Sequence, residues 1–500
     1  TLVTVTNSGG TTATSMAHDS FGGDAVFDYE ISGLYPGDTG TCGTTLASAA
    51  SCTLAIVYSP TAVLYNTGTV NITYDDGAVV GQTASGNLDG DGLRPFFGTG
   101  IDGDLTIAAA NTDFSGLTLA NAHKVTAVVG LASVTNNVLT LNGTISVNDF
   151  AVGDEIMWIV TQAGTSSVGC GALHGSYGFD DVTASTSTTI TISANFPLPN
   201  VDSTELAQAS NVATFCRIQI LKVPNLNSLT VNAGADTFVP SYDHATGKGG
   251  IFAVRVSGTL TLTGDINMNG KGYSGGSGNG SSGAKGHSEI GSGILSNVVD
   301  AASNAMGGAN GVRTSNGAAG GGGYAAGGNG GGSVSGAAGG AAQNYCPGPL
   351  ACLPSQRLFM GGGGGASSSV AQGGNGGGIV YIIADTITGI GIVKTYGADG
   401  VIDPWSGGGG GGGGSILIKA NSLGAGAWTA RAKGGDGGDS PHDGGGGGGG
   451  AAELLYCATT NINIFIDVAG GTSLNGGGNG FAPTNGFNGF GPAPAVAGCP

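Results

Sequence analysis

Few side chains in this 500-residue sequence have the type and spacing that metal binding or catalysis requires. Its six histidines are isolated from one another, and no cysteine and histidine spacing typical of a zinc site occurs. They are His18, His123, His174, His244, His287 and His442. We predict that each histidine lies in a loop or on the surface, and that the protein uses no metal and no other cofactor.

One serine fits the formal motif of a hydrolase nucleophile. Residues 272–276 read Gly-Tyr-Ser-Gly-Gly and match GxSxG. That motif places a nucleophile only where a strand turns into a helix, and no helical pattern follows Ser274. Because glycine accounts for 104 of the 500 residues, such matches also arise by chance. We therefore predict that Ser274 is not catalytic.

The acidic residues show no catalytic or calcium-binding pattern. The segment Asp89-Gly-Asp-Gly begins like a calcium loop but lacks the later ligands and the closing glutamate, so we predict a turn. Polysaccharide cleavage requires two carboxylates at a set separation, and the acids here lie in loops without evident pairing. We predict no catalytic residue, although a polysaccharide-acting β-solenoid enzyme remains the second alternative.

Eight cysteines indicate an oxidising compartment, because an even number in a chain of this type is typical of disulfides. They fall into four pairs that are close in sequence. The pairs are Cys42 with Cys52, Cys170 with Cys216, Cys346 with Cys352, and Cys457 with Cys499. Connectivity cannot be derived from the sequence, so local pairing is a hypothesis, and buried free thiols or a metal site are the alternatives.

A set of loops between glycine runs carries side chains unlike their surroundings. Exposed aromatic rings beside polar groups suit the recognition of a glycan or a protein. The candidate residues are Asp403, Trp405, Asp439, His442, Asp443, Phe481, Phe487 and Phe490. The alternative is that Trp405 and the phenylalanines cap the core of the glycine-rich region.

These loops connect copies of a repeating unit that reads strand, turn, strand and glycine run. The four copies begin at Gly250, Gly378, Gly414 and Gly450. The last three start 36 residues apart, and a long glycine-rich insertion separates the first two by about 128 residues. Alternating apolar residues such as Ile379, Tyr381 and Ile383 predict strands with one buried face. The regular spacing predicts stacked repeats.

The longest glycine runs, 407–414 and 444–450, are compatible neither with a helix nor with an ordinary strand. They could be flexible linkers. Alternatively, extended threefold helices without side chains could pack closely and hydrogen-bond through their backbones, as polyglycine II. Each run leads directly into an apolar strand, which favours the packed bundle. The absence of a strict triplet excludes collagen.

Composition and charge narrow the classes of partner and the domain organisation that we expect. The net charge of −18 would repel phosphate backbones, so we expect no nucleic acid partner. Polar residues such as Asp385 interrupt the longest apolar stretch, 379–393, so we expect no membrane insertion. No signal peptide or cell-wall anchor is visible, which suggests a processed chain or a fragment. We predict an all-β fold with three domains, at 1–100, 101–225 and 226–500.

Residues 1–100 strongly resemble the choice-of-anchor D family of bacterial immunoglobulin-like domains, which is related to the Hydin-type domains. The resemblance is carried by Val5-Thr-Asn-Ser-Gly-Gly, Tyr35-Pro-Gly-Asp-Thr-Gly-Thr-Cys, Leu46-Ala-Ser-Ala-Ala-Ser-Cys-Thr-Leu, Tyr58-Ser-Pro-Thr-Ala and Leu88-Asp-Gly-Asp-Gly. It implies an immunoglobulin-like β-sandwich in an extracellular protein, with Cys42 and Cys52 at the positions of a recurrent pair. The family usually has a strand before the one at Thr1. An upstream segment or a neighbouring subunit would donate that strand.

The glycine-rich tail, with residues 150–155 and 223–234 before it, resembles a class of bacterial glycine-rich surface proteins. Similar polyglycine II sandwiches occur in phage adhesin tips and bacterial surface fibres. The matching segments include Phe150-Ala-Val-Gly-Asp-Glu, Gly258-Thr-Leu-Thr-Leu-Thr-Gly-Asp-Ile, Arg357-Leu-Phe-Met-Gly and Gly434-Gly-Asp-Gly-Gly. We expect an extracellular, non-enzymatic adhesive or fibre protein of a bacterial surface. Its partner would be a cell-surface glycan or protein, or copies of itself. A self-assembling filament or sheath subunit is the first alternative.

Overall fold

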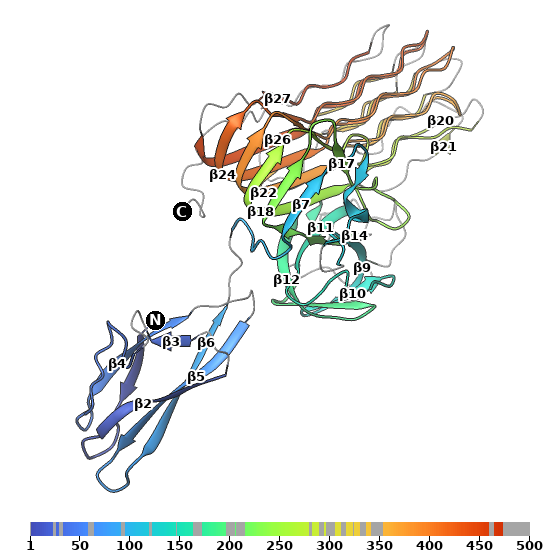
Figure 1. Cartoon of the computed structure of the whole chain (residues 1–500). Coiled ribbons are helices and arrows are strands. Elements are labelled where there is room, and N and C mark those ends of the chain that lie inside the picture. Colours follow the sequence, from blue (N-terminus) through green and yellow to red (C-terminus); the bar gives the residue numbers. More distant parts are fainter. Residues whose placement is uncertain are drawn as a thin grey trace. The chain divides into compact units, whose positions relative to one another are not determined.

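The computed structural model describes residues 2–473 apart from 24–26, 30–33, 59–64, 92–95, 120–122, 147, 164–172, 197–205, 207–215, 280–282, 290–294, 297–305, 312–316, 324, 331–336, 342–353 and 460–464 (Figure 1). Strands dominate, and the helical element whose bounds are described is the 3-10 helix η1 (Phe114–Gly116). The predicted all-β class is confirmed. Within the same ranges, no helix has the length and apolarity needed to span a membrane.

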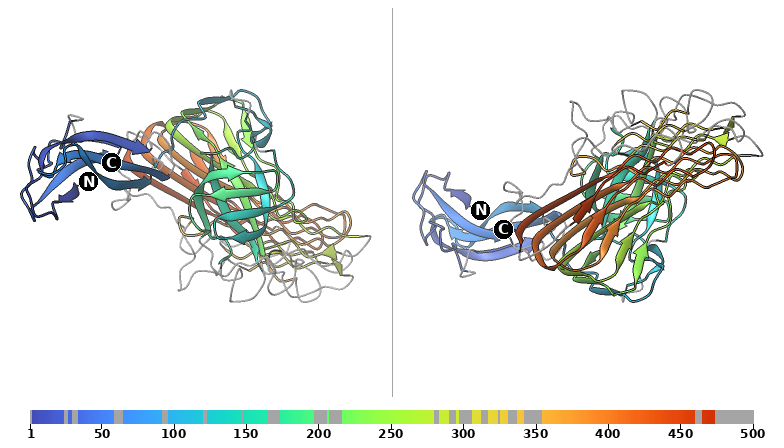
Figure 2. Two further views of the ribbon diagram at one scale, coloured as in Figure 1. Left: turned by 90° about the horizontal axis from the view of Figure 1, so that it is seen from below. Right: turned by 90° about the horizontal axis from the view of Figure 1, so that it is seen from above.

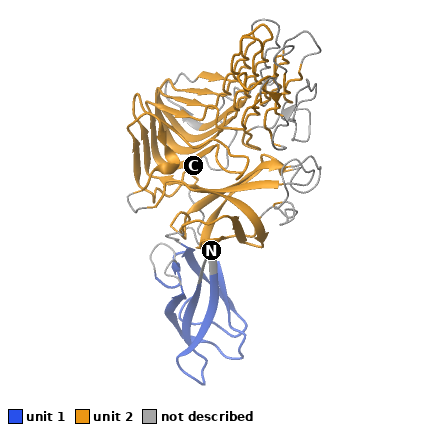
Figure 3. Cartoon of the chain, turned by 90° about the vertical axis from the view of Figure 1, so that its right-hand side faces the viewer, with its two compact units in different colours: residues 1–94 blue, residues 95–500 orange. Residues whose placement is uncertain are grey.

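The chain divides into two compact units, residues 1–94 and 95–500 (Figure 3). The first unit ends close to the boundary predicted at residue 100. The boundary predicted at residue 225 stays a prediction, and strands from both sides of it pair within one sheet of the second unit.

The first unit contains two three-stranded antiparallel sheets that enclose one apolar core. One sheet has the order β1 (Leu2–Thr6), β4 (Ser51–Tyr58), β3 (Phe27–Tyr29), and the other has the order β2 (Thr14–Gly23), β5 (Tyr65–Asp75), β6 (Gln82–Asp91). Successive side chains of a strand point to opposite faces of its sheet, so every second one points into the core. Leu54 of β4 packs there with Val70 and Ile72 of β5.

Two further features mark this unit. A groove of about 500 Å³ is lined by residues of β1, of the segment that follows it and of β2, β5 and β6, including Val5, Met16, Ile72 and Ala84. Strands β1 and β6 are edge strands among the described residues. Donation of a further strand stays a prediction.

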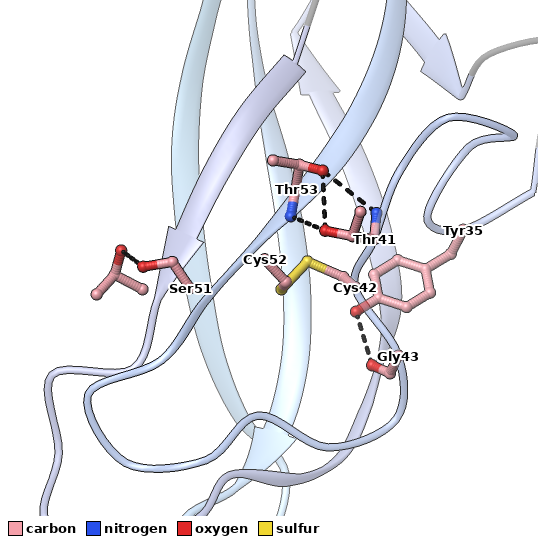
Figure 4. The surroundings of a disulfide bond; sticks show 8 residues. Tyr35, Thr41, Cys42, Gly43, Ser51, Cys52 and Thr53 are labelled. Atoms are coloured by element: carbon pink, nitrogen blue, oxygen red, sulfur yellow. Dashed lines mark hydrogen bonds between the residues drawn. A yellow bond between two sulfur atoms is a disulfide. The ribbon is translucent and has the colours of Figure 1, made fainter.

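The predicted pair Cys42–Cys52 forms a disulfide with a Cα–Cα distance of 4.8 Å (Figure 4). Beside it, the Thr41 N–H donates to the carbonyl oxygen of Thr53 at 2.8 Å. Buried Cys216 is also disulfide-bonded, whereas its predicted partner Cys170 lies outside the described residues. Three more cysteines, Cys346, Cys352 and Cys499, lie outside them too, and for Cys457 only the backbone, in a strand, is described. The three remaining pairings stay predictions.

The second unit contains a closed antiparallel barrel in the order β10-β13-β12-β11-β14-β9. Its strands are β9 (Val128–Thr135), β10 (Val138–Asn142), β11 (Glu155–Ala163), β12 (Tyr177–Ser185), β13 (Thr189–Ile192) and β14 (Cys216–Val223). Apolar side chains such as Leu139, Ile156 and Ile220 fill its interior. Strand β11 is buried along its whole length, because its outward residues Met157 and Ile159 pack against the adjoining sheet.

That adjoining sheet and a second one consist of parallel strands stacked repeat upon repeat (Figure 1). The larger sheet runs β26 (Ala451–Thr459), β24 (Ser415–Gly426), β22 (Ile379–Gly389), β18 (Ile251–Leu262), β16 (Ser228–Val231), β7 (Asp104–Ile107), with β15 (Asn225–Leu226) beside β18. The smaller sheet runs β27 (Phe465–Asp467), β25 (Thr429–Arg431), β23 (Ile392–Lys394), β19 (Asp265–Asn267), β17 (Asp236–Phe238), β8 (Thr112–Asp113). A two-stranded pair, β20 (Gly283–Ala284) and β21 (Leu295–Ser296), lies apart.

The strand register confirms the predicted repeats. Ile379 pairs with Ser415 and Ser415 with Ala451, in steps of 36 residues, while Ile251 pairs with Ile379 across the long insertion. Two shorter copies, β7 with β8 and β16 with β17, extend the stack beyond the four that the sequence indicated. Side chains of both sheets meet in one core, where Val254 and Ile382 face Val393. The first halves of β18, β22 and β24 are buried on both faces, as is typical of parallel sheets, whereas β17, β19, β23 and β25 of the smaller sheet each bury one face.

Glycine-rich segments continue from these strands and run side by side (Figure 2). The run 407–414 is hydrogen-bonded to six of them, 317–323, 360–366, 372–378, 395–400, 432–438 and 444–450. The N–H groups of Gly409, Gly410 and Gly411 donate to Gly365, Gly445 and Ala398, and those of the next three residues donate to Gly362, Gly448 and Thr395. Every third N–H group of this run thus donates to the same neighbouring segment.

At the glycines of these runs, the neighbouring backbone leaves no space for a side chain. A β-carbon on Gly410 would overlap the carbonyl group of Gly435, and one on Gly412 would overlap that of Gly322. Glycine is therefore required here by the close approach of neighbouring backbones. The described runs are packed segments and not solvent-exposed linkers.

Candidate functional site

Three loops connect glycine runs at the end remote from the two parallel sheets. They are residues 367–371, 401–406 and 439–443, and we call them the tip loops. Each follows a run that leads away from the sheets and precedes a run that returns to the next strand, such as 407–414 before β24. The packed runs therefore determine where the tip loops lie.

Buried polar side chains tie the tip loops together. The Ser368 hydroxyl donates to Asp403 Oδ2 at 3.0 Å, and the Ser440 hydroxyl donates to the Asp403 carbonyl oxygen at 2.7 Å. The backbone N–H of Ser440 donates to Asp443 Oδ1 at 2.8 Å. Asp403 and Asp443 are almost completely buried. Both were predicted as recognition residues, and in the structure their carboxylates are buried and hydrogen-bonded to serines of the tip loops.

The outward side chains of the tip loops are mostly apolar. Trp405 is 60% exposed and Ile402 is 58% exposed. Val401 and Val370 are exposed as well, and the Val401 N–H donates to Gln372 O at 2.9 Å, which places their two loops side by side. We call Val370, Val401, Ile402 and Trp405 the tip patch. Trp405 does not cap a core, so that alternative is wrong for this residue.

The other predicted recognition residues have mixed outcomes. Asp439 is exposed and His442 is half-buried, both in the third tip loop. Phe481, Phe487 and Phe490 lie outside the described residues. Sequence analysis did not single out Val370, Val401 or Ile402. Their signal was present, because apolar residues are unusual in loops flanked by glycine.

A second polar cluster was missed because its members are distant in sequence. The imidazoles of His244 and His287 lie with ring centroids 4.2 Å apart, beside a pocket of about 590 Å³ that Ser274 also lines. His174 is buried nearby and bonded to the Tyr273 hydroxyl at 3.1 Å. His174 lies in a turn, so the prediction of a loop or surface position holds for this residue, but its side chain is buried.

Burial keeps these imidazoles neutral. It lowers the pKa of His244 to about 3, with a smaller contribution from the neighbouring His287, and it also lowers the pKa of His287. Burial lowers the pKa of His174 to about 3. Gln162 of β11 lies with Nε2 3.0 Å from His244 Nδ1, so the cluster spans the contact between barrel and glycine-rich region.

The cluster does not have the geometry of a catalytic triad. The Asp243 carboxylate accepts hydrogen bonds from Ala245 N–H and the Thr246 hydroxyl, and none is formed between Asp243 and His244 in the described chain. Nor does the Ser274 hydroxyl bond to an imidazole there. Among the same residues, no group of three or more His, Cys, Asp or Glu side chains is placed to hold a metal ion.

Comparison with known proteins identified no relative of this chain. No protein-family model matches the sequence, and no curated protein or solved structure is similar to it.

Proposed function

We propose that this chain is an extracellular, non-enzymatic adhesive or fibre protein of a bacterial surface, which presents the tip patch to a surface partner. The observation that carries the proposal is the exposure of Trp405 and Ile402 at the remote end of the packed glycine runs. A group of exposed apolar side chains on neighbouring loops is typical of interaction sites. Tryptophan in particular contributes strongly to binding when a partner covers it.

The glycine runs would act as a rigid support for this patch. We propose that they are polyglycine II helices, and the three-residue repeat of donor direction in 407–414 supports that assignment. A preformed loop loses less conformational entropy on binding than a flexible one. The hydrogen bonds of Asp403 and Asp443 with tip-loop serines would likewise reduce the entropy that the loops lose on binding.

The first unit would be an immunoglobulin-like domain that joins this head to the rest of a surface structure. Two facing antiparallel sheets around one core support this assignment. The disulfides at Cys42, Cys52 and Cys216 support an extracellular location, because such bonds persist in oxidising compartments.

The test is a binding assay of the full chain on glycan arrays and on whole bacterial and host cells. We expect binding to be lost in Trp405→Ala and kept in Phe465→Ala. Phe465 is a matched control because it is 57% exposed and lies in β27, outside the tip loops. Equal binding of the Trp405→Ala variant and the unmodified chain would refute the role of the patch. Concentration-dependent polymers in negative-stain micrographs would instead favour the filament subunit.

A further inference from the structure

The chemistry of the tip loops distinguishes between the possible partners of the proposed site. The four members of the tip patch present hydrocarbon and one indole ring to solvent. A glycan site combines an aromatic platform with several polar side chains that point outward to sugar hydroxyls.

Here the polar side chains mostly point inward. Ser368, Asp403, Ser440 and Asp443 are buried and bonded among the loops. Ser367 and Ser406 are buried too, with their hydroxyls 2.7 Å apart. The loops therefore offer an outward surface on which apolar contact predominates, which matches the core of a protein interface better than a sugar.

The charges around the tip patch further narrow the class of partner. Asp399, Asp436 and Asp439 are exposed in or next to the tip loops. The tip loops contain no lysine or arginine, and the runs that flank them contain one, Lys433, at the strand end of 432–438. Lys285 also lies near the first loop, because Ala366 N–H donates to the carbonyl oxygen of Ala284. An anionic partner would be repelled, whereas basic groups around an apolar pocket would complement this surface.

We infer that the tip patch docks onto a protein surface in which basic residues surround an apolar pocket that receives Trp405. The inference rests on the proposed function and specifies its partner. The bound tryptophan would be the anchor of the interface, and the flanking carboxylates would mainly raise the association rate and its dependence on salt.

The probe is a pair of immobilised amphipathic peptides with identical leucine positions, one with lysine and one with glutamate at every polar position. Surface plasmon resonance of the full chain should show at least tenfold tighter binding to the lysine peptide. Trp405→Ala should weaken that binding about 30-fold, as expected for an interface anchor. Asp439→Asn should reduce its salt dependence more than Asp19→Asn, a matched charge change at an exposed position of the first unit.

Equal binding to both peptides, or lysine-peptide binding that is unchanged in Trp405→Ala, would overturn the inference. So would Trp405-dependent binding to a neutral glycan or to phosphatidylcholine vesicles in place of the peptide. If cell binding depends on Trp405 but peptide binding does not, the proposed function stands and only the basic partner is wrong. If neither depends on Trp405, both proposals fail.

Discussion

Arg255 of β18 donates from Nε to both carboxylate oxygens of Glu155 in β11, at 2.9 and 2.8 Å. Both side chains are nearly buried, and the guanidinium group also lies 4.9 Å from the ring centroid of Phe179. The pair joins the barrel to the larger parallel sheet. Because each charge depends on the other for compensation, this contact is sensitive to the loss of either one.

Glu155→Gln should destabilise the second unit by about 3–5 kcal/mol, because it leaves a buried guanidinium group without its counter-charge. Chemical denaturation measures this change. The double variant Glu155→Gln with Arg255→Met should recover much of the lost free energy, since no charge is then left unpaired. A single variant as stable as the unmodified chain would show that solvent reaches this contact.

Gly410→Ala should destabilise the glycine bundle by more than about 1–3 kcal/mol, the usual cost of overpacking, because its methyl group would overlap the Gly435 carbonyl. Thermal unfolding provides the measurement. Gly116→Ala is the control in the same unit, since its methyl would meet only Asp113 atoms at 3.9 Å. Similar melting temperatures for both variants would contradict the packing of the runs.

Removal of the Cys42–Cys52 disulfide, as the double variant Cys42→Ser with Cys52→Ser, should cost the first unit about 2–4 kcal/mol. Urea denaturation followed by a probe in that unit measures the loss. The double variant separates this bond from that of Cys216, which a reducing agent would also break. Mass spectrometry of an unreduced digest tests the three remaining predicted pairs.

Acid should destabilise the second unit through its neutral histidines. In the unfolded chain His174 and His244 bind protons near their ordinary pKa of 6.5, whereas in the folded chain burial lowers both pKa values to about 3. The unfolded state therefore binds more protons between these pH values, and stability falls as the pH falls through that window. The contribution of each group has a slope of up to about 1.4 kcal/mol per pH unit.

Denaturation midpoints measured from pH 8 to pH 4 would reveal this trend. His244→Phe should flatten the dependence, because it removes one of the two imidazoles whose pKa burial lowers. A steeper decline in His244→Phe would mean that the folded state takes up the proton.

The repeats were predictable because the information is local and periodic. Alternation in residues 379–383 and a spacing of 36 residues are enough to align Ile379 with Ser415. Barrel closure was not predictable, since it requires β14 to pair with both β9 and β11 across long stretches of chain. Pairing of that kind depends on the whole core and leaves no local signal.

The site was predictable only in part for a related reason. Trp405 stood out by its type, and its exposure agrees with the recognition hypothesis. Asp403 and Asp439 look alike in sequence, yet one is buried among serines and the other is exposed. His244 and His287 meet only because the chain returns after 43 residues, the difference between their numbers.

Successive N–H groups of the run 407–414 donate to different neighbouring runs, and this arrangement has a mechanical consequence. A pull on Trp405 is carried inward by the two runs that flank its loop, 395–400 and 407–414, and the second of these is bonded sideways to six neighbours. Sliding one run out of the bundle would break bonds in several directions within the same short displacement. Tension at the tip is thereby shared by many chains in parallel before it reaches strands β23 and β24.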